Sequence, residues 1–363
     1  MTIPNVVAVP NLLAIPNVLA IPHAVIPFAA VNYFEPWWVQ IVKALVIFAV
    51  IFAILPILTV YERKLLGRFQ ARYGPNRVGP FGLLQPMAEI VKFAMKEPSR
   101  PTTSVGYLFR IAPMIAIITA VTALAIIPWG DVQHIFGQPV GLYGIDVSIG
   151  PLFVFALGGI SFYGIMLGGW ASGSKYSFLG AMRGAAQLIS YEVSQGLSLL
   201  GVVITAQTLS LTGIVHAQEG MWYIVPQIVG FLIFMTASFA ETNRAPFDLV
   251  EADAELVAGY FTEYGGTPFV AYLFAEYANM IVVSGIAATV FLGGWLLPGN
   301  PHIPGWIDPF IVGAKMMIFI TLFIWIRATL PRLRYDQLMS FGWKILLPLA
   351  TLNLLVTAIV VVS

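Results

Sequence analysis

Cysteine is absent from the 363 residues of this chain, and charged side chains make up only 10% of them. Without thiols, the chain forms no disulfide and anchors no thiolate metal site or iron–sulfur cluster. The net charge of +1 argues against any general affinity for nucleic acid. The four histidines lie outside the long apolar runs and lack metal-ligand spacing, and they are His23, His134, His216 and His302. Any redox cofactor must therefore belong to a partner protein.

Hydrophobic residues, by contrast, make up 59% of the chain and gather in long runs. A helix needs about 20 apolar residues to cross the hydrocarbon core of a bilayer. We therefore predict an all-α polytopic membrane protein with about eight transmembrane helices, and with amphipathic helices in its long cytoplasmic loops. The expected spans are 37–61, 105–128, 151–170, 184–206, 222–241, 269–294, 309–330 and 341–362.

Positive charges divide the connections between these spans into two kinds. Sixteen of the 18 lysines and arginines lie in or beside the connections 62–104, 171–183, 242–268 and 331–340. The alternate connections contain none, and they are 129–150, 207–221 and 295–308. By the positive-inside rule, both termini lie on the outer side and the basic connections face the cytoplasm. Lys43 and Lys315 lie near outer helix ends, where long side chains are expected to snorkel to the membrane surface.

The first 27 residues repeat a hexapeptide of the form IPNVVA, with proline at every sixth position. These prolines remove helical hydrogen bonds, so we expect an extended arm rather than a membrane helix. The arm has no basic n-region and is a poor signal peptide. We divide the chain into a proline-rich arm on the outer side, 1–36, and a membrane domain, 37–363.

Five of the 17 acidic residues crowd into the segment from Glu241 to Glu255. After Pro246, Asp248, Glu251 and Glu255 follow at i, i+3 and i+7, so a helix here would carry them on one face. Clustered carboxylates raise one another's proton affinity, and beside a membrane they are a candidate proton-handling site. A solvated loop is the alternative interpretation.

Two further carboxylates lie inside predicted spans. Glu192 is about 8 residues into the fourth span and Glu276 about 7 into the sixth, which places both roughly 10–12 Å below the inner surface. An ionised carboxylate at a helix centre costs about 2.5–3.5 kcal/mol on insertion scales. A wet cavity, an ion pair or protonation offsets that cost. Their common depth, with Glu241 close by, favours a function over a structural hydrogen bond.

The first inner connection carries eight positive charges and an apolar stretch around Glu89 and Lys92. An amphipathic helix there would bury the apolar side chains Ile90, Val91, Phe93 and Ala94. Basic residues next to a membrane most often set orientation or contact anionic lipid. Here they lie on the same side as the acidic segment, so we expect the two connections to pack together around a shared polar site.

These segments, taken together, resemble the H subunit of the proton-pumping NADH:quinone oxidoreductase, respiratory complex I. The likeness covers about residues 36–361 in one order, and its motifs are specific. The stretches that carry it are Glu62–Gly79, Leu84–Glu89, Trp170–Tyr176, Leu179–Arg183, Ile189–Glu192, Ala240–Leu249, Glu251–Glu255, Phe274–Met280 and Arg327–Gln337. Glu89 stands where the family more often has aspartate and Ala254 where serine is frequent, and the proline-rich arm has no counterpart.

The resemblance implies a membrane protein at the heel of an L-shaped complex, where a quinone enters a chamber shared with soluble subunits. The residues that would line or border this chamber are Glu62, Arg63, Arg68, Arg72, Lys92, Phe247 and Asp248. The residues that would form an acidic proton path into the membrane arm are Glu192, Glu241, Glu251, Glu255 and Glu276.

The same resemblance implies that quinone is the substrate and that this chain alone binds no cofactor or metal. FMN and iron–sulfur clusters would belong to soluble partners, and the membrane partners would be antiporter-like and small subunits and lipid. Reduction of quinone would place negative charge in a low-dielectric chamber and shift proton affinities along the acidic path. The resemblance thus implies a translocase that acts only within its complex, and we expect that complex in a bacterial plasma membrane.

Three alternatives remain at this point. A related membrane component of a hydrogenase or formate-hydrogenlyase complex would be distinguished by its partner proteins. A stand-alone ion-coupled transporter would also contain intramembrane carboxylates, but the two halves of the chain show no repeated broken-helix pattern. A purely structural anchor is disfavoured by the cost of burying Glu192 and Glu276.

Overall fold

The computed structural model describes residues 36–135, 138–251, 253–299 and 304–362. The proline-rich stretch, for which we expect an extended arm, lies outside the described residues. The α-helices are α1 (Trp37–Phe69), α2 (Gln85–Met95), α3 (Gly106–Leu124), α4 (Gly150–Ala171), α5 (Lys175–Ala206), α6 (Leu211–His216), α7 (Ile228–Glu241), α8 (Asp253–Leu256), α9 (Thr267–Phe291), α10 (Asp308–Thr329), α11 (Tyr335–Phe341) and α12 (Leu347–Val362). Short 3-10 turns cover Pro80–Gly82, Gly259–Phe261 and Gly305–Ile307, and a π-helical turn, Gly342–Leu346, joins α11 to α12.

The described residues contain seven helical segments that are long and apolar enough to cross a membrane. Six of them centre on α1, α3, α4, α5, α9 and α10, and the seventh runs from α11 through α12. The shorter apolar helix α7 stands in the expected span 222–241. The predicted all-α polytopic membrane fold is confirmed. The sequence pattern did not predict a small antiparallel hairpin, in which β1 (Val132–Ile135) pairs with β2 (Gln138–Gly141).

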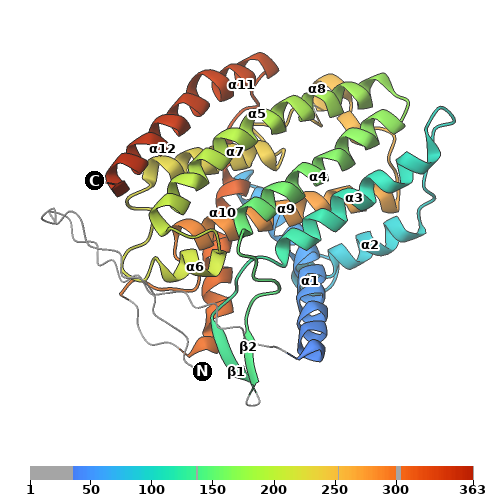
Figure 1. Ribbon diagram of the computed structural model, residues 1–363. Helices are drawn as coiled ribbons and strands as arrows, with labels where there is room; N and C mark the ends of the chain where they lie inside the picture. The colour runs from blue at the N-terminus through green and yellow to red at the C-terminus, as the bar shows by residue number, and fades with distance from the viewer. Residues whose placement is uncertain (1–35, 136–137, 252, 300–303, 363) are drawn as a thin grey trace, which may run out of the picture. The chain divides into compact units, whose positions relative to one another are not determined.

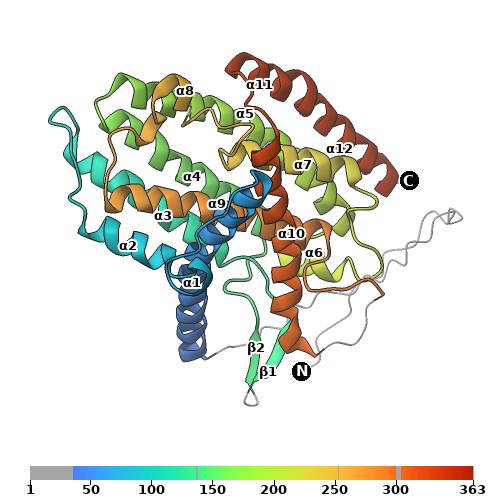
Figure 2. The same ribbon diagram turned by 180° about the vertical axis from the view of Figure 1, so that it is seen from behind.

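The central helix of the bundle is α9, which contacts α3, α10, α7, α6, α2 and α1 (Figure 1). Seen from behind, α10 and α1 lie beside it (Figure 2). Among the spans, α5 and α9 are the least hydrophobic and the most enclosed by protein, whereas α1 and α12 are the most hydrophobic and the least enclosed. Polar side chains are therefore concentrated on helices that lipid hardly touches.

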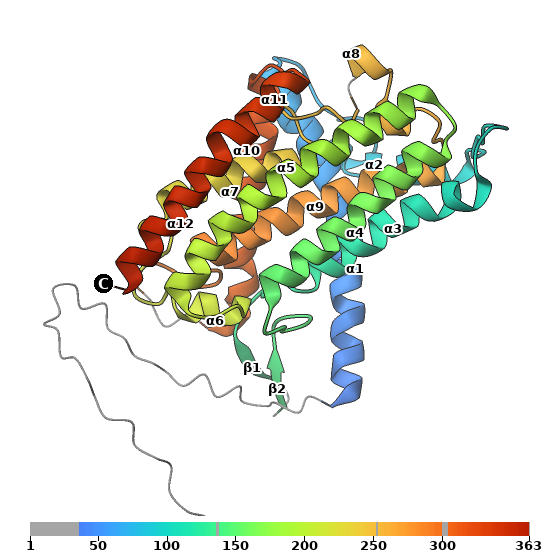
Figure 3. The ribbon, with the colours of Figure 1, turned by 45° about the horizontal axis from the view of Figure 1, so that its top comes forward.

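Helix α12 runs along α5 at one edge of the bundle (Figure 3). A buried glutamine, Gln227, joins α12 to the start of α7, because its Nε2 donates to Thr357 Oγ1 at 2.9 Å. Its Oε1 accepts from Asn353 Nδ2 at 3.2 Å. Both ends of this amide are thus satisfied by neutral partners, as buried polar groups require.

The amphipathic helix expected in the first inner connection is α2. Ile90 and Phe93 are half-buried, and the ring of Phe93 lies 5.8 Å from that of Phe269 on α9. Val91 and Ala94, which we expected to share this face, are exposed. Hence α2 packs on the bundle by one narrow edge only.

The expectation that Lys315 snorkels is wrong. Its side chain is only 6% exposed, and its Nζ donates to three backbone carbonyls, those of Leu292, Gly294 and Leu296, at 2.7, 2.6 and 2.5 Å. The ammonium also lies 4.6 Å from the centre of the Trp222 ring. Three carbonyls satisfy the three donors of an ammonium group, so Lys315 holds the turn after α9 instead of reaching for water.

Replacing Lys315 by methionine is expected to destabilise the turn after α9 by about 1–2 kcal/mol, because buried carbonyls lose charge-assisted hydrogen bonds. Because the variant no longer buries an ammonium group, which is itself unfavourable, part of that loss is offset. The thermal unfolding midpoint of the purified complex measures the effect. The matched variant, Lys43→Met, removes a lysine that has a cation–π contact with Tyr143 at 5.1 Å and should shift the midpoint less. Equal shifts would contradict the assigned role.

Candidate functional site

A buried ion cluster lies where α1, α10 and the segment after α7 meet. Helix α1 continues past the expected span to Phe69, so Glu62 lies on a helix rather than in a loop. The Glu62 side chain is 3% exposed, and Arg244 Nη1 lies 3.1 Å from its Oε1. Arg327 of α10 donates to the same oxygen. Three distant parts of the chain thus meet at one carboxylate.

Arg244 connects this cluster to α9. Its guanidinium lies 4.6 Å from the centre of the Tyr277 ring, and its Nε and Nη2 atoms are buried without a hydrogen bond to any described residue. Tyr277 follows Glu276 directly in the sequence. The contact therefore brings the cluster to the turn of α9 that bears the buried carboxylate.

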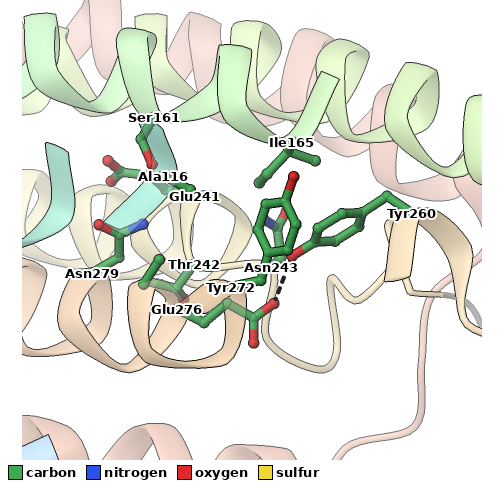
Figure 4. A pocket seen from close by; sticks show the side chains of 11 residues that line it. Ala116, Ser161, Ile165, Glu241, Thr242, Asn243, Tyr260, Tyr272, Glu276 and Asn279 are labelled. Carbon is green, nitrogen blue, oxygen red and sulfur yellow. Dashed lines mark hydrogen bonds between the residues drawn. The ribbon is translucent and has the colours of Figure 1, made fainter. Parts of the chain in front are cut away.

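Around Glu276 a second group of polar side chains gathers. The hydroxyl of Tyr260 donates to Glu276 Oε1 at 3.3 Å, as Figure 4 shows. Burial, together with the nearby carboxylates, raises the pKa of Tyr260 well above its usual value, so its hydroxyl stays protonated. Burial and the neighbouring Glu276 and Asp248 likewise raise the pKa of Glu251. The surroundings of Glu276 therefore favour the protonated forms of Tyr260 and Glu251.

A small cavity of about 10 Å³ lies between Glu276 and the end of α7 (Figure 4). Its lining includes Glu276 and Asn279 from α9, Ser161 from α4, and Glu241. A space of this size admits about one water molecule, which requires two to four polar partners. The lining supplies such partners between the two carboxylates.

Glu241 lines the cavity and also forms a hydrogen bond with a residue of α5. Gln195 Nε2 donates to Glu241 Oε2 at 2.6 Å. One turn earlier on α5 lies Glu192, which is half-buried. Polar side chains thus follow one another from Glu276 through the cavity to Glu241 and on to the turn of Glu192.

The expected carboxylate face from Asp248 to Glu255 does not form. Residues 248–251 are not helical, and α8 covers only Asp253–Leu256. Backbone atoms here bond elsewhere, for example Phe247 O, which accepts from Gln187 Nε2 at 2.8 Å. Glu255 consequently lies at the surface beside Arg183, whose hydrogen bond lowers the pKa of this carboxyl.

Phe247, Asp248 and Glu251 are less exposed than Glu255. Phe247 is buried with its ring 5.6 Å from that of Tyr191, and Asp248 Oδ1 is buried. Asp248 and Glu251 both interact with the Glu276 carboxyl. The structure therefore brings Asp248, Glu251 and Glu276 together and leaves Glu255 apart.

The predicted basic entrance residues lie on the exposed end of α1 and beyond it. Arg63 pairs with Glu89 of α2, and Arg72 bonds Gln70 at 2.8 Å. Arg63, Arg72 and Tyr73 line an open hollow of about 430 Å³. Arg68 and Lys92 are exposed nearby in sequence, but neither lines this hollow.

Sequence reasoning missed several polar residues of the site. They are Ser161, Gln195, Tyr260, Tyr272 and Asn279, all buried or half-buried around the carboxylates. In the sequence, Arg244 and Arg327 served only as evidence for the membrane topology and for the family resemblance, although both pair with Glu62 in the structure. A polar residue three positions after Glu192 in an apolar helix was the one signal that pointed to Gln195.

Comparisons with known proteins find extensive similarity to one family. Residues 42–358 match the model of a family described as NADH dehydrogenase. The chain is 50% identical over 320 residues to an H subunit of NADH-quinone oxidoreductase from Geobacter metallireducens, covering 88% of this chain and 95% of the relative. It is 48% identical over 301 residues to the corresponding H subunit from Protochlamydia amoebophila, covering 83% and 91%. It is 49% identical over 325 residues to the one from Deinococcus deserti, covering 88% and 83%.

Proposed function

Because the chain belongs to the NADH dehydrogenase family and its relatives include H subunits of NADH-quinone oxidoreductase, we propose that it borders the quinone chamber and links quinone reduction to proton translocation. The observation that carries this proposal is the run of polar groups from the buried Glu62 and Arg244 to the half-buried Glu276 and Glu241. A helix bundle in lipid bears the cost of such groups only where they are paired or wet.

The basic end of α1 is the proposed approach to the chamber. The hollow beside Arg63 and Arg72 is open and large enough to admit a ring-sized headgroup. Phe247 and Asp248 form the proposed inner border, since Asp248 acts electrostatically on Glu276 and Phe247 precedes Asp248 in the sequence. Quinone is the substrate, and FMN and iron–sulfur clusters belong to soluble partner proteins.

Charge provides the proposed coupling. Reduced quinone carries negative charge into a site where few waters screen it, so its field acts strongly on nearby ionisable groups. Glu62 and Arg244 would respond first, and Glu276 and Glu241 would then exchange protons across the cavity between them. Antiporter-like membrane subunits are the proposed recipients of this change.

The proposed site of action is a bacterial plasma membrane, with both chain termini on the outer side. Sixteen of 18 lysines and arginines lie in or beside alternate connections, which by the positive-inside rule face the cytoplasm. The soluble partners would therefore dock on the side of α2 and the segment 242–268.

Replacing Glu276 or Glu241 by glutamine tests the acidic path. Each variant complex is expected to assemble yet lose at least about tenfold in quinone reduction coupled to proton uptake, because an amide accepts no proton at these positions. Coupled turnover in membrane vesicles measures this. Glu219→Gln, at an exposed carboxylate beside His216, is the control and should retain turnover. Normal turnover and proton uptake in both site variants would remove the proposal.

A further inference from the structure

Gln195 has a buried amide of which only the donor end is satisfied by described residues, a feature that it shares with Gln187 on the same helix. The residue is 2% exposed, and Nε2 donates to Glu241 Oε2 at 2.6 Å and to Ser238 Oγ at 3.3 Å. Its Oε1 is buried and accepts no hydrogen bond from any residue that the structure describes. A buried carbonyl without a donor is unfavourable, and an apolar side chain here would avoid that cost.

Gln227 provides the contrast. It is also a buried glutamine between helices, but both ends of its amide meet neutral partners, Asn353 and Thr357. A structural amide is satisfied in this way. Gln187 also has an unsatisfied Oε1, but its Nε2 donates to the backbone carbonyls of Ala240 and Phe247. Gln195 differs from both glutamines because its donor is directed at a carboxylate, and this partner points to a different role.

We propose that Gln195 is a positioning residue that holds the Glu241 carboxyl in its place between α5 and the cavity and responds to its protonation. The bond to an ionised carboxylate is charge-assisted and about twice as strong as a neutral one. When Glu241 takes up a proton, rotation of the amide brings Oε1 to the position of Nε2. Oε1 then accepts the carboxyl hydrogen, and Glu241 keeps a partner in both states.

This role rests on the proposed function, because it requires Glu241 to exchange protons. Ser161 and Asn279 line the cavity beside Glu241. Among the residues that the structure describes, however, the side chain that donates a hydrogen bond to the Glu241 carboxyl is that of Gln195. Glu192 lies one turn away on the same helix, so α5 carries a second carboxylate close to the residue that bonds Glu241.

The test is Gln195→Met in the intact complex, a change that keeps side-chain length and removes both amide ends. The rate of proton uptake coupled to quinone reduction is expected to fall about tenfold, with the KM for quinone unchanged. The pH profile is expected to move about half to one unit toward higher pH, because the ionised carboxyl loses its charge-assisted hydrogen bond. An infrared band of the protonated carboxyl, assigned by its loss in Glu241→Gln, should change frequency.

Gln227→Met is the matched control and should lower thermal stability without moving the pH profile or the infrared band. If Gln195→Met does not assemble, Gln195→Asn replaces it, since it keeps the amide but withdraws it by one methylene. An unchanged rate, profile and band in the Gln195 variant, beside an inactive Glu241→Gln, would overturn the role of Gln195 alone. An active Glu241→Gln would instead overturn the acidic path itself.

Discussion

Replacing Arg244 by methionine is expected to lower the stability of this protein by about 3–5 kcal/mol, the usual cost of leaving a buried charge unpaired. Glu62 is 3% exposed and would keep as its ion-pair partner Arg327, whose side chain is 38% exposed. The ring of Tyr277 would also lose the guanidinium that covers it. The thermal unfolding midpoint and the yield of assembled complex measure the loss.

A double-mutant cycle separates the pair from its surroundings. Glu62→Gln in the Arg244→Met background should recover part of the lost stability, because the buried charge is then removed. Arg63→Met is the control, since the Arg63–Glu89 pair is exposed and such pairs contribute about 0–1 kcal/mol. Additive effects of the two buried changes would show that Glu62 and Arg244 do not stabilise each other.

Gly180→Ala is expected to destabilise the protein by about 2–3 kcal/mol, the upper part of the range of about 1–3 kcal/mol found when a well-packed core receives an extra methyl group. A Cβ at this position of α5 would lie 2.8 Å from Val250 O, 2.9 Å from Gly259 Cα and 3.0 Å from Tyr260 N. All three are backbone atoms of the segment that carries Glu251 and Tyr260. Alanine favours a helix over glycine by about 1 kcal/mol, which is too little to compensate.

Gly196 supplies the matched control on the same helix. Its Cβ would meet only Phe155 Cε2, at 4.0 Å, so Gly196→Ala should gain up to about 1 kcal/mol. Thermal unfolding midpoints of the two variant complexes should therefore move in opposite directions. Movement in the same direction would show that helix propensity, rather than contact with the acidic segment, governs both sites.

The sequence predicted the spans well, because each requires a long apolar run and little else. The expected spans end before α1 ends and begin after α5 begins, since Glu62–Phe69 and Lys175–Arg183 contain charged side chains yet are helical. Hydropathy detects the part of a helix that lipid covers. It does not detect the rest of such a helix, which tertiary contacts such as the Glu62–Arg244 pair help to hold.

The site was harder to predict than the fold. Glu241 and Glu276 stood out because carboxylates are rare in apolar runs. The pairing of Glu62 with Arg244 depends on contacts between residues 182 positions apart, which no spacing rule reveals. Lys315 was misjudged because its partners are backbone carbonyls of a turn, and a sequence shows carbonyls everywhere.

The inverse relation between hydropathy and enclosure has a consequence for how new chemistry could arise in this protein. An ionisable side chain introduced on α1 or α12 would face hydrocarbon, so it would hinder insertion of that helix into the membrane. On α9 the same substitution would face neighbouring helices, whose hydroxyl and amide groups can hydrogen-bond to the new side chain. The innermost helix is thus the most permissive place for altering charge, although it is also the place where a change in volume is least tolerated.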